Sequence, residues 1–309
     1  MPQKLTLIGH KIRKICISCA NLYHQRKLMS SILIAESGST KTDWCLLKKG
    51  AKSKNHKTAG INPYLQNGGE MLSVLEDGLG GWLKKAPDAV FFYGAGLGNT
   101  IRQKEVKGVL KQYFDIKQVT ADSDLIAAAR GLCGNDKGIV CILGTGSNSC
   151  YYNGRQVKDK QVSLGYVAGD EGSGNHLGKR VLQYYAYNTF DTELKMAFEQ
   201  RFGNDISLIL HKLYKEPFPN RYLAGFVQLL KENRGHFMVE NILEDCLNDF
   251  FHHHILKYRQ SWKLPVNFTG SVAYEFRDVI LALCEQYELQ AGKIEKSPLK
   301  GLIKYHNPN

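Results

Sequence analysis

Two short turns in the sequence join glycine to hydroxyl side chains, a composition suited to binding phosphate. The first turn follows the apolar run "ILIAES" and consists of Gly38, Ser39, Thr40, Lys41 and Thr42. Glycine lets a ligand approach the backbone N–H groups without meeting a Cβ, and successive amides can form a concavity that binds an anion. The hydroxyl groups add donors and the lysine adds a positive charge. We therefore predict a phosphate-binding loop here.

A second turn of this kind lies 108 residues further along and consists of Gly144, Thr145, Gly146, Ser147 and Asn148. Neither turn has the G-x-x-x-x-G-K-[ST] spacing of a P-loop. One such turn alone is typical of an ordinary hairpin, but two turns that each open an α/β half indicate an internal duplication. Two facing loops of this type could hold one polyphosphate from both sides.

Four carboxylates stand where a strand or loop gives way to a predicted helix, and they are the candidates for acid–base chemistry: Asp122, Asp124, Asp170 and Glu171. Transfer of a phosphoryl group to an alcohol needs the hydroxyl in line, the phosphate charge neutralised and a base for the proton. Each carboxylate could instead satisfy N–H groups at the start of a helix. Asp122 is the better candidate for that capping role.

The elements that must position these groups alternate between strand and helix. Apolar alternation predicts strands over 31–36 and 42–48, and a third in "SKNHKTAGINPY". The pattern continues with a helix over 68–84, a strand in "AVFFYGAG", a helix over 100–114, a strand over 116–120 and a helix from about 123. It restarts with "GIVCILGTGSNSCYYNG", and long helices over 173–189, 191–214 and 220–260 precede a last strand, turn and helix in "PVNFTGSVAY". The predicted fold class is α/β, with a helical insertion in the second half.

The cluster of breakers in "GLCGNDKG" marks the boundary between the halves, so we expect domains over 29–133 and 134–309. Residues 1–28 carry six Lys and Arg and no Asp or Glu, and we expect this basic extension to be disordered. It supplies half of the net charge of +12. The other basic residues are scattered, so no nucleic-acid partner is predicted.

Several residue types argue against other classes of protein. No apolar stretch is long enough for a membrane span, and charges interrupt the N-terminal apolar runs, unlike in a secretory signal. Six of the eight cysteines sit in apolar runs, which indicates a reduced, cytoplasmic protein. Cys16 and Cys19 form a single C-x-x-C, and His252, His253 and His254 are consecutive, so on a helix their side chains point about 100° apart. We predict no metal site from either group and expect the histidines on a partly solvated helix face.

Four motifs occur in an order that resembles a known family: "ESGSTKTDW", "LGTGSNS", "GYVAGDEGSGNHLG" and "FTGSVA". Together they are similar to the sugar kinase, heat-shock chaperone and actin superfamily, and specifically to the BadF/BadG/BcrA/BcrD-type ATPase family with N-acetylglucosamine kinase. The resemblance covers nearly everything from Ile32 to the end. It implies two ribonuclease-H-like (actin-like ATPase) domains with ATP and substrate in a central cleft.

The resemblance also implies roles for individual residues. Asp124 matches the catalytic base, with Asp122 as the second candidate, and Asn62 matches a sugar contact, although it could equally be a turn residue before Pro63. ATP would be bound by the two turns (Gly38, Ser39, Thr40, Lys41, Thr42, Gly144, Thr145 and Gly146) and by the adenosine loop (Gly270, Ser271 and Ala273). The sugar would be bound by Asn62, Thr145, Asn148, Asp170 and Glu171.

One position departs from the family pattern. Members carry Asp at the end of the first strand, where it holds magnesium through water, and this chain has Glu36. Glutamate keeps the carboxylate but adds a methylene, so we expect that it can still hold magnesium through water with shifted geometry, and the rate and the metal preference stay open.

These features, together with the resemblance, predict an ATP-dependent phosphotransferase acting on a hydroxyl of an amino sugar. The resemblance implies the 6-hydroxyl of N-acetylglucosamine, while N-acetylmuramic acid, glucosamine and an anhydro sugar stay open as substrates. One alternative is a BadF-type ATPase activator of a dehydratase, although its cysteine spacing is missing here. Another is a nucleotide- or sugar-binding sensor without transferase activity, which Glu36 keeps open. Since relatives are often dimers, a homodimer is also open.

Overall fold

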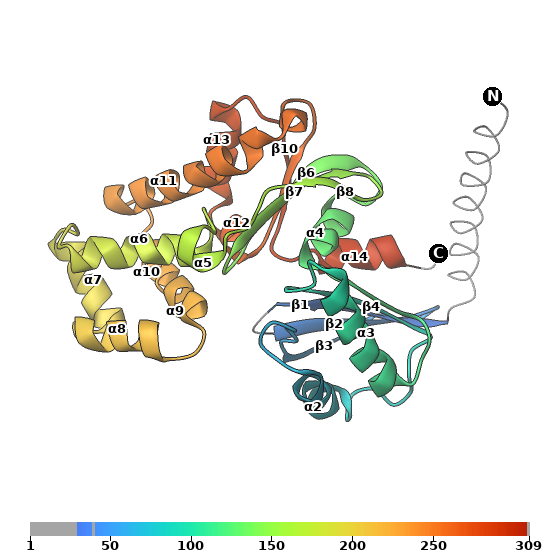
Figure 1. The fold of residues 1–309 in the computed structure, drawn as a ribbon. Helices are drawn as coiled ribbons and strands as arrows, with labels where there is room; N and C mark the ends of the chain where they lie inside the picture. Colours follow the sequence, from blue (N-terminus) through green and yellow to red (C-terminus); the bar gives the residue numbers. More distant parts are fainter. Residues whose placement is uncertain (1–29, 39–40, 308–309) are drawn as a thin grey trace, which may run out of the picture. The chain divides into compact units, whose positions relative to one another are not determined.

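The computed structural model describes residues 30–38 and 41–307. The chain divides into two compact units, one running to Asp124 and resuming at Leu302, the other spanning Leu125–Gly301. Figure 1 shows their elements. The predicted basic extension, residues 1–28, lies outside the described residues.

The first unit is built on a five-stranded sheet of order β3-β2-β1-β4-β5. Strands β1 to β3 pair antiparallel, whereas β4 and β5 add to β1 in parallel. The strands are β1 (Ser31–Ser37), β2 (Lys41–Lys48), β3 (Lys54–Ala59), β4 (Ala89–Gly94) and β5 (Val119–Ser123), and the helices between them are α2 (Gly68–Leu79) and α3 (Thr100–Phe114).

Alternation along the strands decides which face of this sheet is covered. Leu33, Ala35, Trp44 and Phe92 point to one face, where they form a core with apolar residues of α2 and α3. Residues at the alternate positions point to the other face and carry the polar groups of interest. Both helices begin at an asparagine whose side chain accepts a hydrogen bond from the first turn.

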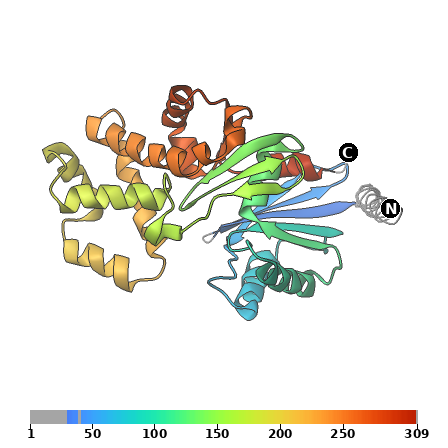
Figure 2. The same cartoon turned by 45° about the horizontal axis from the view of Figure 1, so that its top comes forward.

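The second unit repeats this topology. Its sheet has the order β10-β9-β6-β7-β8. Strands β6, β7 and β8 pair antiparallel, and β9 and β10 add to β6 in parallel, as β4 and β5 add to β1 in the first sheet. Both sheets can be followed in Figure 2. The predicted duplication is therefore confirmed in the topology. The strands are β6 (Lys137–Leu143), β7 (Ser147–Asn153), β8 (Val157–Lys160), β9 (Val266–Thr269) and β10 (Ala291–Glu295).

Helices pack on both faces of the second sheet. On one face, Leu125, Ala128 and Leu132 of α4 pack against Val140 and other strand residues. On the other face, the helical insertion and α12 to α13 form the largest core of the molecule. The helices are α4 (Asp124–Cys133), α5 (Gly165–Ala168), α6 (Gly174–Ala186), α7 (Thr192–Phe202), α8 (Ile206–Lys215), α9 (Pro219–Gly225), α10 (Val227–Glu232), α11 (Phe237–His253), α12 (Ser271–Glu275), α13 (Arg277–Gln286) and α14 (Leu299–His306), with short 3₁₀ turns η1 (Ile255–Lys257) and η2 (Arg259–Trp262).

The insertion contains more and shorter helices than the sequence pattern predicts. Gly203, with φ of 85°, ends α7, and Asp205 then caps α8 by accepting N–H groups of its first turn. Likewise, Gly235, with φ of 89°, lies between α10 and α11. Apolar periodicity runs across both interruptions because the helices on either side face one core.

The division between units differs from the predicted boundary after residue 133. Nearly all of α4 belongs to the second unit because its apolar residues pack on β6 and β7. Helix α14 begins in the second unit and ends in the first, where the ring of His306 stacks on Phe91 at a centroid distance of 4.0 Å. Within the second unit, Gly131 and Gly301 make a close backbone contact, since a Cβ on Gly301 would lie 1.7 Å from the carbonyl oxygen of Gly131.

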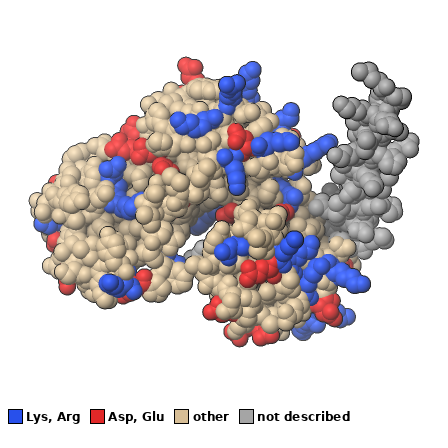
Figure 3. Space-filling view, in the orientation of Figure 1, with Lys and Arg blue, Asp and Glu red and all other residues tan. Residues whose placement is uncertain are grey.

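The surface shows no single dominant charge on the face drawn in Figure 3, where Lys and Arg side chains are interspersed with Asp and Glu. Among the described residues, no helix has the length and apolar character needed to cross a bilayer.

Candidate nucleotide and sugar site

Buried hydroxyl groups at the ends of β1 and β2 hold the two strands that flank the first predicted turn. The hydroxyl oxygens of Ser37 and Thr42 lie 2.7 Å apart, and Ser37 Oγ accepts the backbone N–H of Ile61 at 2.9 Å. Thr42 is fully buried, so its hydroxyl supports the hairpin from inside. Ser37 was not predicted from the sequence, although its burial follows from its place as the last residue of β1.

Lys41 lies at the surface and pairs within its own strand. Its ammonium lies 2.7 Å from Asp43 Oδ2, and its carbonyl oxygen accepts the N–H of Gly38 at 2.9 Å. Ser39 and Thr40, the other predicted ligands of this turn, lie outside the described residues.

Glu36 belongs to a row of acidic residues that crosses the first sheet. It is paired with Asp43 on β2 and with Tyr93 on β4, and Tyr93 is in turn paired with Asp122 on β5. Paired residues project from the same face of a sheet, so three carboxylates and a phenol share one row. The Tyr93 hydroxyl lies 2.6 Å from Nε2 of His306. Asp43 and Tyr93 were not predicted as site residues, because only the strand register connects them to Glu36.

Asp124 is the first residue of α4 and follows β5 directly. It is half-buried, at the change from strand to helix where it was expected. Asp122 lies inside β5, which begins and ends about three residues later than predicted. Ser123, and not Asp122, therefore precedes the first helical residue.

Asn62 forms the turn that the alternative interpretation expected. Its side-chain oxygen accepts the N–H of Tyr64 at 3.0 Å, and its own N–H is donated to Gln66 at 2.9 Å. A Cβ on Gly96, with φ of 82°, would lie 2.6 Å from the Asn62 side-chain oxygen.

The second predicted turn, between β6 and β7, is held by the start of α6. The carbonyl oxygen of Gly144 accepts the N–H of Gly174 at 2.8 Å, and that of Thr145 accepts the N–H of Asn175 at 3.0 Å. Within the turn, the N–H of Gly144 is donated to the Gly146 carbonyl at 3.0 Å. The Thr145 side chain is exposed.

The predicted adenosine loop lies against the same turn. Gly270 has φ of 120°, and a Cβ there would lie 2.1 Å from the carbonyl oxygen of Leu143, so a side chain is excluded by both strain and space. Ser271 is exposed at the start of α12, whereas Ala273 is fully buried. The structure thus brings together three motifs that are far apart in the sequence.

Asp170 ties the second turn to α6. One carboxylate oxygen accepts the N–H of Ser147 at 3.3 Å, and the other accepts the Asn175 side-chain amide at 2.8 Å. Asp170 adopts the left-handed conformation, with φ of 60°, which is rare for a residue other than glycine. Ser173, not an acidic residue, caps α6 by accepting the N–H of His176. The capping alternative for Asp170 and Glu171 is therefore wrong.

Glu171 is connected to a buried chain of side chains. Glu171 Oε2 lies 3.2 Å from His254 Nε2, and His254 Nδ1 lies 3.1 Å from Ser149 Oγ. Ser149 Oγ lies 2.8 Å from the Tyr258 hydroxyl, which accepts the N–H of Gln161 at 2.9 Å. The expectation of a partly solvated face was wrong for His254, which caps the end of α11, is 3% exposed and has its ring stacked on Phe250.

Burial and hydrogen bonding shift the pKa of this pair. Burial lowers the pKa of His254 and outweighs the opposing effect of Glu171. For Glu171, burial alone would raise the pKa, but hydrogen bonds from its own backbone N–H and from His254 lower it overall. Near neutral pH the imidazole of His254 is therefore neutral and the carboxylate of Glu171 is ionised.

Asn148, the last residue of the second predicted turn, bonds to its neighbour in β7. Asn148 is half-buried, and its side-chain oxygen accepts the N–H of Ser149 at 2.9 Å. Among the described residues, no group of three His, Cys, Asp or Glu side chains is arranged to hold a metal ion. The six cysteines in the described part of the chain are buried. Burial raises the pKa of Cys133 to about 11 and that of Cys246 to about 12, so these thiols stay protonated.

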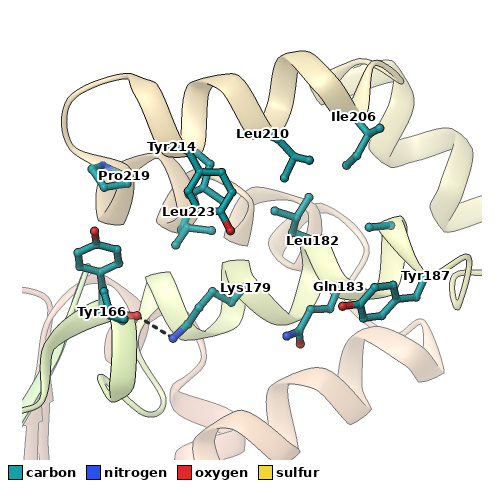
Figure 4. A pocket seen from close by; sticks show the side chains of 13 residues that line it. Tyr166, Lys179, Leu182, Gln183, Tyr187, Ile206, Leu210, Tyr214, Pro219 and Leu223 are labelled. Carbon is teal, nitrogen blue, oxygen red and sulfur yellow. Dashed lines mark hydrogen bonds between the residues drawn. The ribbon is translucent and has the colours of Figure 1, made fainter.

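A pocket of about 520 Å³ lies within the helical insertion (Figure 4). Tyr166, Tyr187 and Tyr214 line it together with aliphatic residues of α6 and α8, and Lys179 donates to the Tyr166 carbonyl at 2.8 Å. None of the predicted site residues lines this pocket.

Comparison with known proteins gives two informative structures. The chain matches a structure described as a candidate N-acetylglucosamine kinase from Porphyromonas gingivalis, with 38% identity and a TM-score of 0.85, over 90% of this chain and 99% of that one. A second structure, given the same description in Chromobacterium violaceum, has 17% identity and a TM-score of 0.71 over 90% and 99% of the two chains, and shows the shared fold. No protein-family profile and no curated protein matches the chain.

Proposed function

We propose that this chain is an ATP-dependent sugar kinase, since it belongs to the same family as the Porphyromonas gingivalis protein. The finer proposal is that it phosphorylates the 6-hydroxyl of N-acetylglucosamine and belongs to the BadF/BadG/BcrA/BcrD-type group. We also propose that it works in the cytoplasm, as a monomer or homodimer, without nucleic-acid or membrane partners.

One observation carries the proposal: the Gly144–Gly146 turn, the start of α6 and Gly270 converge in the second unit. The Gly144 and Thr145 carbonyls are bound by α6, Asp170 ties the turn to Asn175, and Gly270 packs against Leu143. These contacts fix a glycine-rich turn without filling the space beside Gly144, where a Cβ would meet no atom within 4 Å. A rigid glycine-rich turn with unfilled space beside it fits the binding of a polyphosphate.

The other predicted residues are assigned roles from the chemistry of phosphoryl transfer. Asp124 would accept the proton of the sugar hydroxyl as that oxygen attacks the terminal phosphorus, and ADP would leave with the bridging oxygen. Gly38 and Lys41 of the first turn, with Gly144 to Gly146 of the second, would bind the phosphates. Glu171, Asn148 and Asn62 would bind sugar hydroxyl or acetamido groups. Asp170 would act mainly by holding the second turn, because both its oxygens accept hydrogen bonds from the protein.

The described residues fit magnesium only as an ion carried by ATP. They contain no cluster of three ligating side chains, whereas Mg²⁺ bound through phosphates and water needs only one or two carboxylates. Glu36, with Asp43 and Asp122 in the same row of the sheet, could hold such an ion through water. The ion would neutralise phosphate charge during transfer.

The test is sugar-dependent turnover. The full chain is incubated with ATP, magnesium and a panel of N-acetylglucosamine, glucosamine, N-acetylmuramic acid and glucose, and ADP is measured. We expect ADP release with N-acetylglucosamine and none without sugar, and the 6-deoxy analogue should be inert. ADP release that does not depend on any sugar would refute the kinase proposal.

A non-catalytic sensor is the second candidate, and Glu36 is the observation that favours it. Glu36→Asp separates the two, because a large gain in turnover would indicate a weakened enzyme, and an unchanged, substantial rate would show that glutamate serves. A sensor would show no sugar-dependent turnover with either glutamate or aspartate at this position. The activator of a dehydratase gains no support from the described cysteines, which are all buried.

A further inference from the structure

We propose that His254 is a positioning residue that orients the Glu171 carboxylate for sugar binding, at the end of a one-way hydrogen-bond chain from Tyr258 through Ser149. This inference rests on the proposed function, since it concerns the same sugar site. It adds a residue 83 positions from Glu171 that no motif includes.

The direction of the chain follows from counting donors. The N–H of Gln161 is donated to the Tyr258 oxygen, so the Tyr258 hydroxyl proton is available for Ser149 Oγ. The Ser149 hydroxyl proton is then available for His254 Nδ1. With Nδ1 as an acceptor, a neutral imidazole carries its proton on Nε2, which faces Glu171 Oε2. Each group thus donates once, and the chain ends on the carboxylate.

This hydrogen-bond chain is rigid because its members are buried and belong to separate elements of the fold. Ser149 on β7 and Tyr258 between η1 and η2 are fully buried, and His254 stacks on Phe250 of α11 with ring centroids 4.6 Å apart. The Glu171 side chain, by contrast, is 24% exposed and so can reach a ligand. The hydrogen-bond chain therefore connects β7, the helical insertion and the exposed end of Glu171.

The backbone on both sides of Glu171 is also fixed. Asp170 before it is held at φ of 60° by its two carboxylate contacts, and Gly172 after it has φ of 68° and packs against Phe250. The Gly172 N–H is donated to His176 at 3.1 Å. With the backbone fixed in this way, the rotamer of Glu171 is the remaining freedom, and His254 removes it.

Loss of His254 should therefore weaken sugar binding and leave ATP binding unchanged. A carboxylate that is no longer oriented loses its contacts to the sugar in the ground state and the transition state alike, which raises KM with little change in kcat. We expect His254→Ala to raise the KM for N-acetylglucosamine by about tenfold or more. The KM for ATP should stay within about twofold.

The experiment compares four variants in the full chain. His254→Gln can return an N–H donor towards Glu171 and should recover much of the loss, and Tyr258→Phe should give a smaller rise in sugar KM. His253→Ala is the matched control, because His253 is exposed on the neighbouring position and should behave as wild type. Thermal unfolding of each variant confirms folding. Unchanged sugar KM in folded His254→Ala, an equal rise in both KM values, or no recovery in His254→Gln would overturn the proposal.

A second measurement does not depend on turnover. Nitrogen-15 NMR of the His254 ring at pH 7.5 should show a neutral imidazole protonated on Nε2, and Ser149→Ala should perturb Nδ1. A ring protonated on Nδ1 or on both nitrogens would overturn the proposed chain even in an active enzyme. Conversely, a wild-type protein that turns over no sugar would refute the kinase, while the NMR result would still decide the orientation of His254 towards Glu171.

Discussion

The carboxylate of Asp170 lies against Gly146, so closely that a Cβ on Gly146 would come within 2.8 Å of Asp170 Oδ2. The neighbouring Gly144, in the same turn, has open space where its Cβ would be. The two glycines therefore have different physical reasons to be glycine, the first to admit a carboxylate of the protein and the second to leave the space beside the turn unfilled.

Substitution of these glycines should separate folding from binding. Gly144→Ala should keep wild-type thermal stability but weaken ATP binding by about tenfold, because the added methyl group fills the open space beside the turn where the phosphates would lie. Gly146→Ala should lower both stability and ATP affinity, since Asp170 must move. Gly225→Ala, at an exposed position of the same unit with no atom near its Cβ, is the control. Wild-type ATP affinity in Gly144→Ala would place the phosphates elsewhere.

Asp170→Asn tests the proposed structural role of this carboxylate. Both oxygens now accept hydrogen bonds, so an amide would set an NH₂ group against either Ser147 N or the Asn175 side chain. We expect a loss of about 1–3 kcal/mol in the free energy of unfolding, measured in urea. Asp245→Asn, on the exposed side of α11, should change it little. If Asp170→Asn keeps full stability and loses only sugar binding, Asp170 is a sugar ligand instead.

Asp124→Asn tests the base. Loss of the proton acceptor should lower kcat by about 10²–10⁴-fold while the Kd for ATP changes little. Single-turnover kinetics with saturating sugar, together with calorimetric ATP binding, provide the two values. The same substitution at Asp122 is the informative comparison, because a larger fall in kcat there would assign the base to β5.

Stability should decrease as the pH falls below about 6.5. Burial lowers the pKa of both His254 and His176, so the unfolded chain takes up these protons at a higher pH than the folded one does. Stability is therefore full above the unfolded pKa and is lost as the pH falls towards the folded values. Around His254, Glu171 and Asp170 oppose this shift, and His253 adds to it.

The measurement is the urea midpoint at pH 7.5, 6.5 and 5.5. His254→Gln cannot titrate and should show a shallower dependence on pH, whereas His253→Gln, at an exposed position, should stay close to the wild type, because burial and not His253 is the main cause of the shift. Equal slopes in all three proteins would contradict the role assigned to burial. The lowered pKa of Glu171 acts in the same direction, but only at more acid pH.

Much of the architecture could be predicted because it depends on local patterns. Short apolar runs identify β1 and β2, and the glycine-rich turn that follows identifies the end of β6, since both signals lie within a few residues. The breaks at Gly203 and Gly235 were missed because apolar periodicity persists through them, and only the positive φ angles show that the helices end there.

The candidate site was predictable in its motifs but not in its contacts. The hydrogen bond of His254 to Glu171 joins residues 83 positions apart, and the acidic row of Glu36, Asp43 and Asp122 depends on the register of three strand pairs. Burial of a histidine at a helix end also leaves no local signal, because it depends on the Ser149 and Tyr258 hydroxyls that the fold brings to it.

The last helix of the chain has a practical consequence for dissecting this protein. Since α14 returns His306 to Tyr93 and Phe91, a recombinant fragment that stops at residue 124 would expose the aromatic face of β4 to solvent. The amino-terminal half should then be obtained as a well-behaved species only when the segment from Leu302 is supplied, either as a separate peptide or by a short covalent linker.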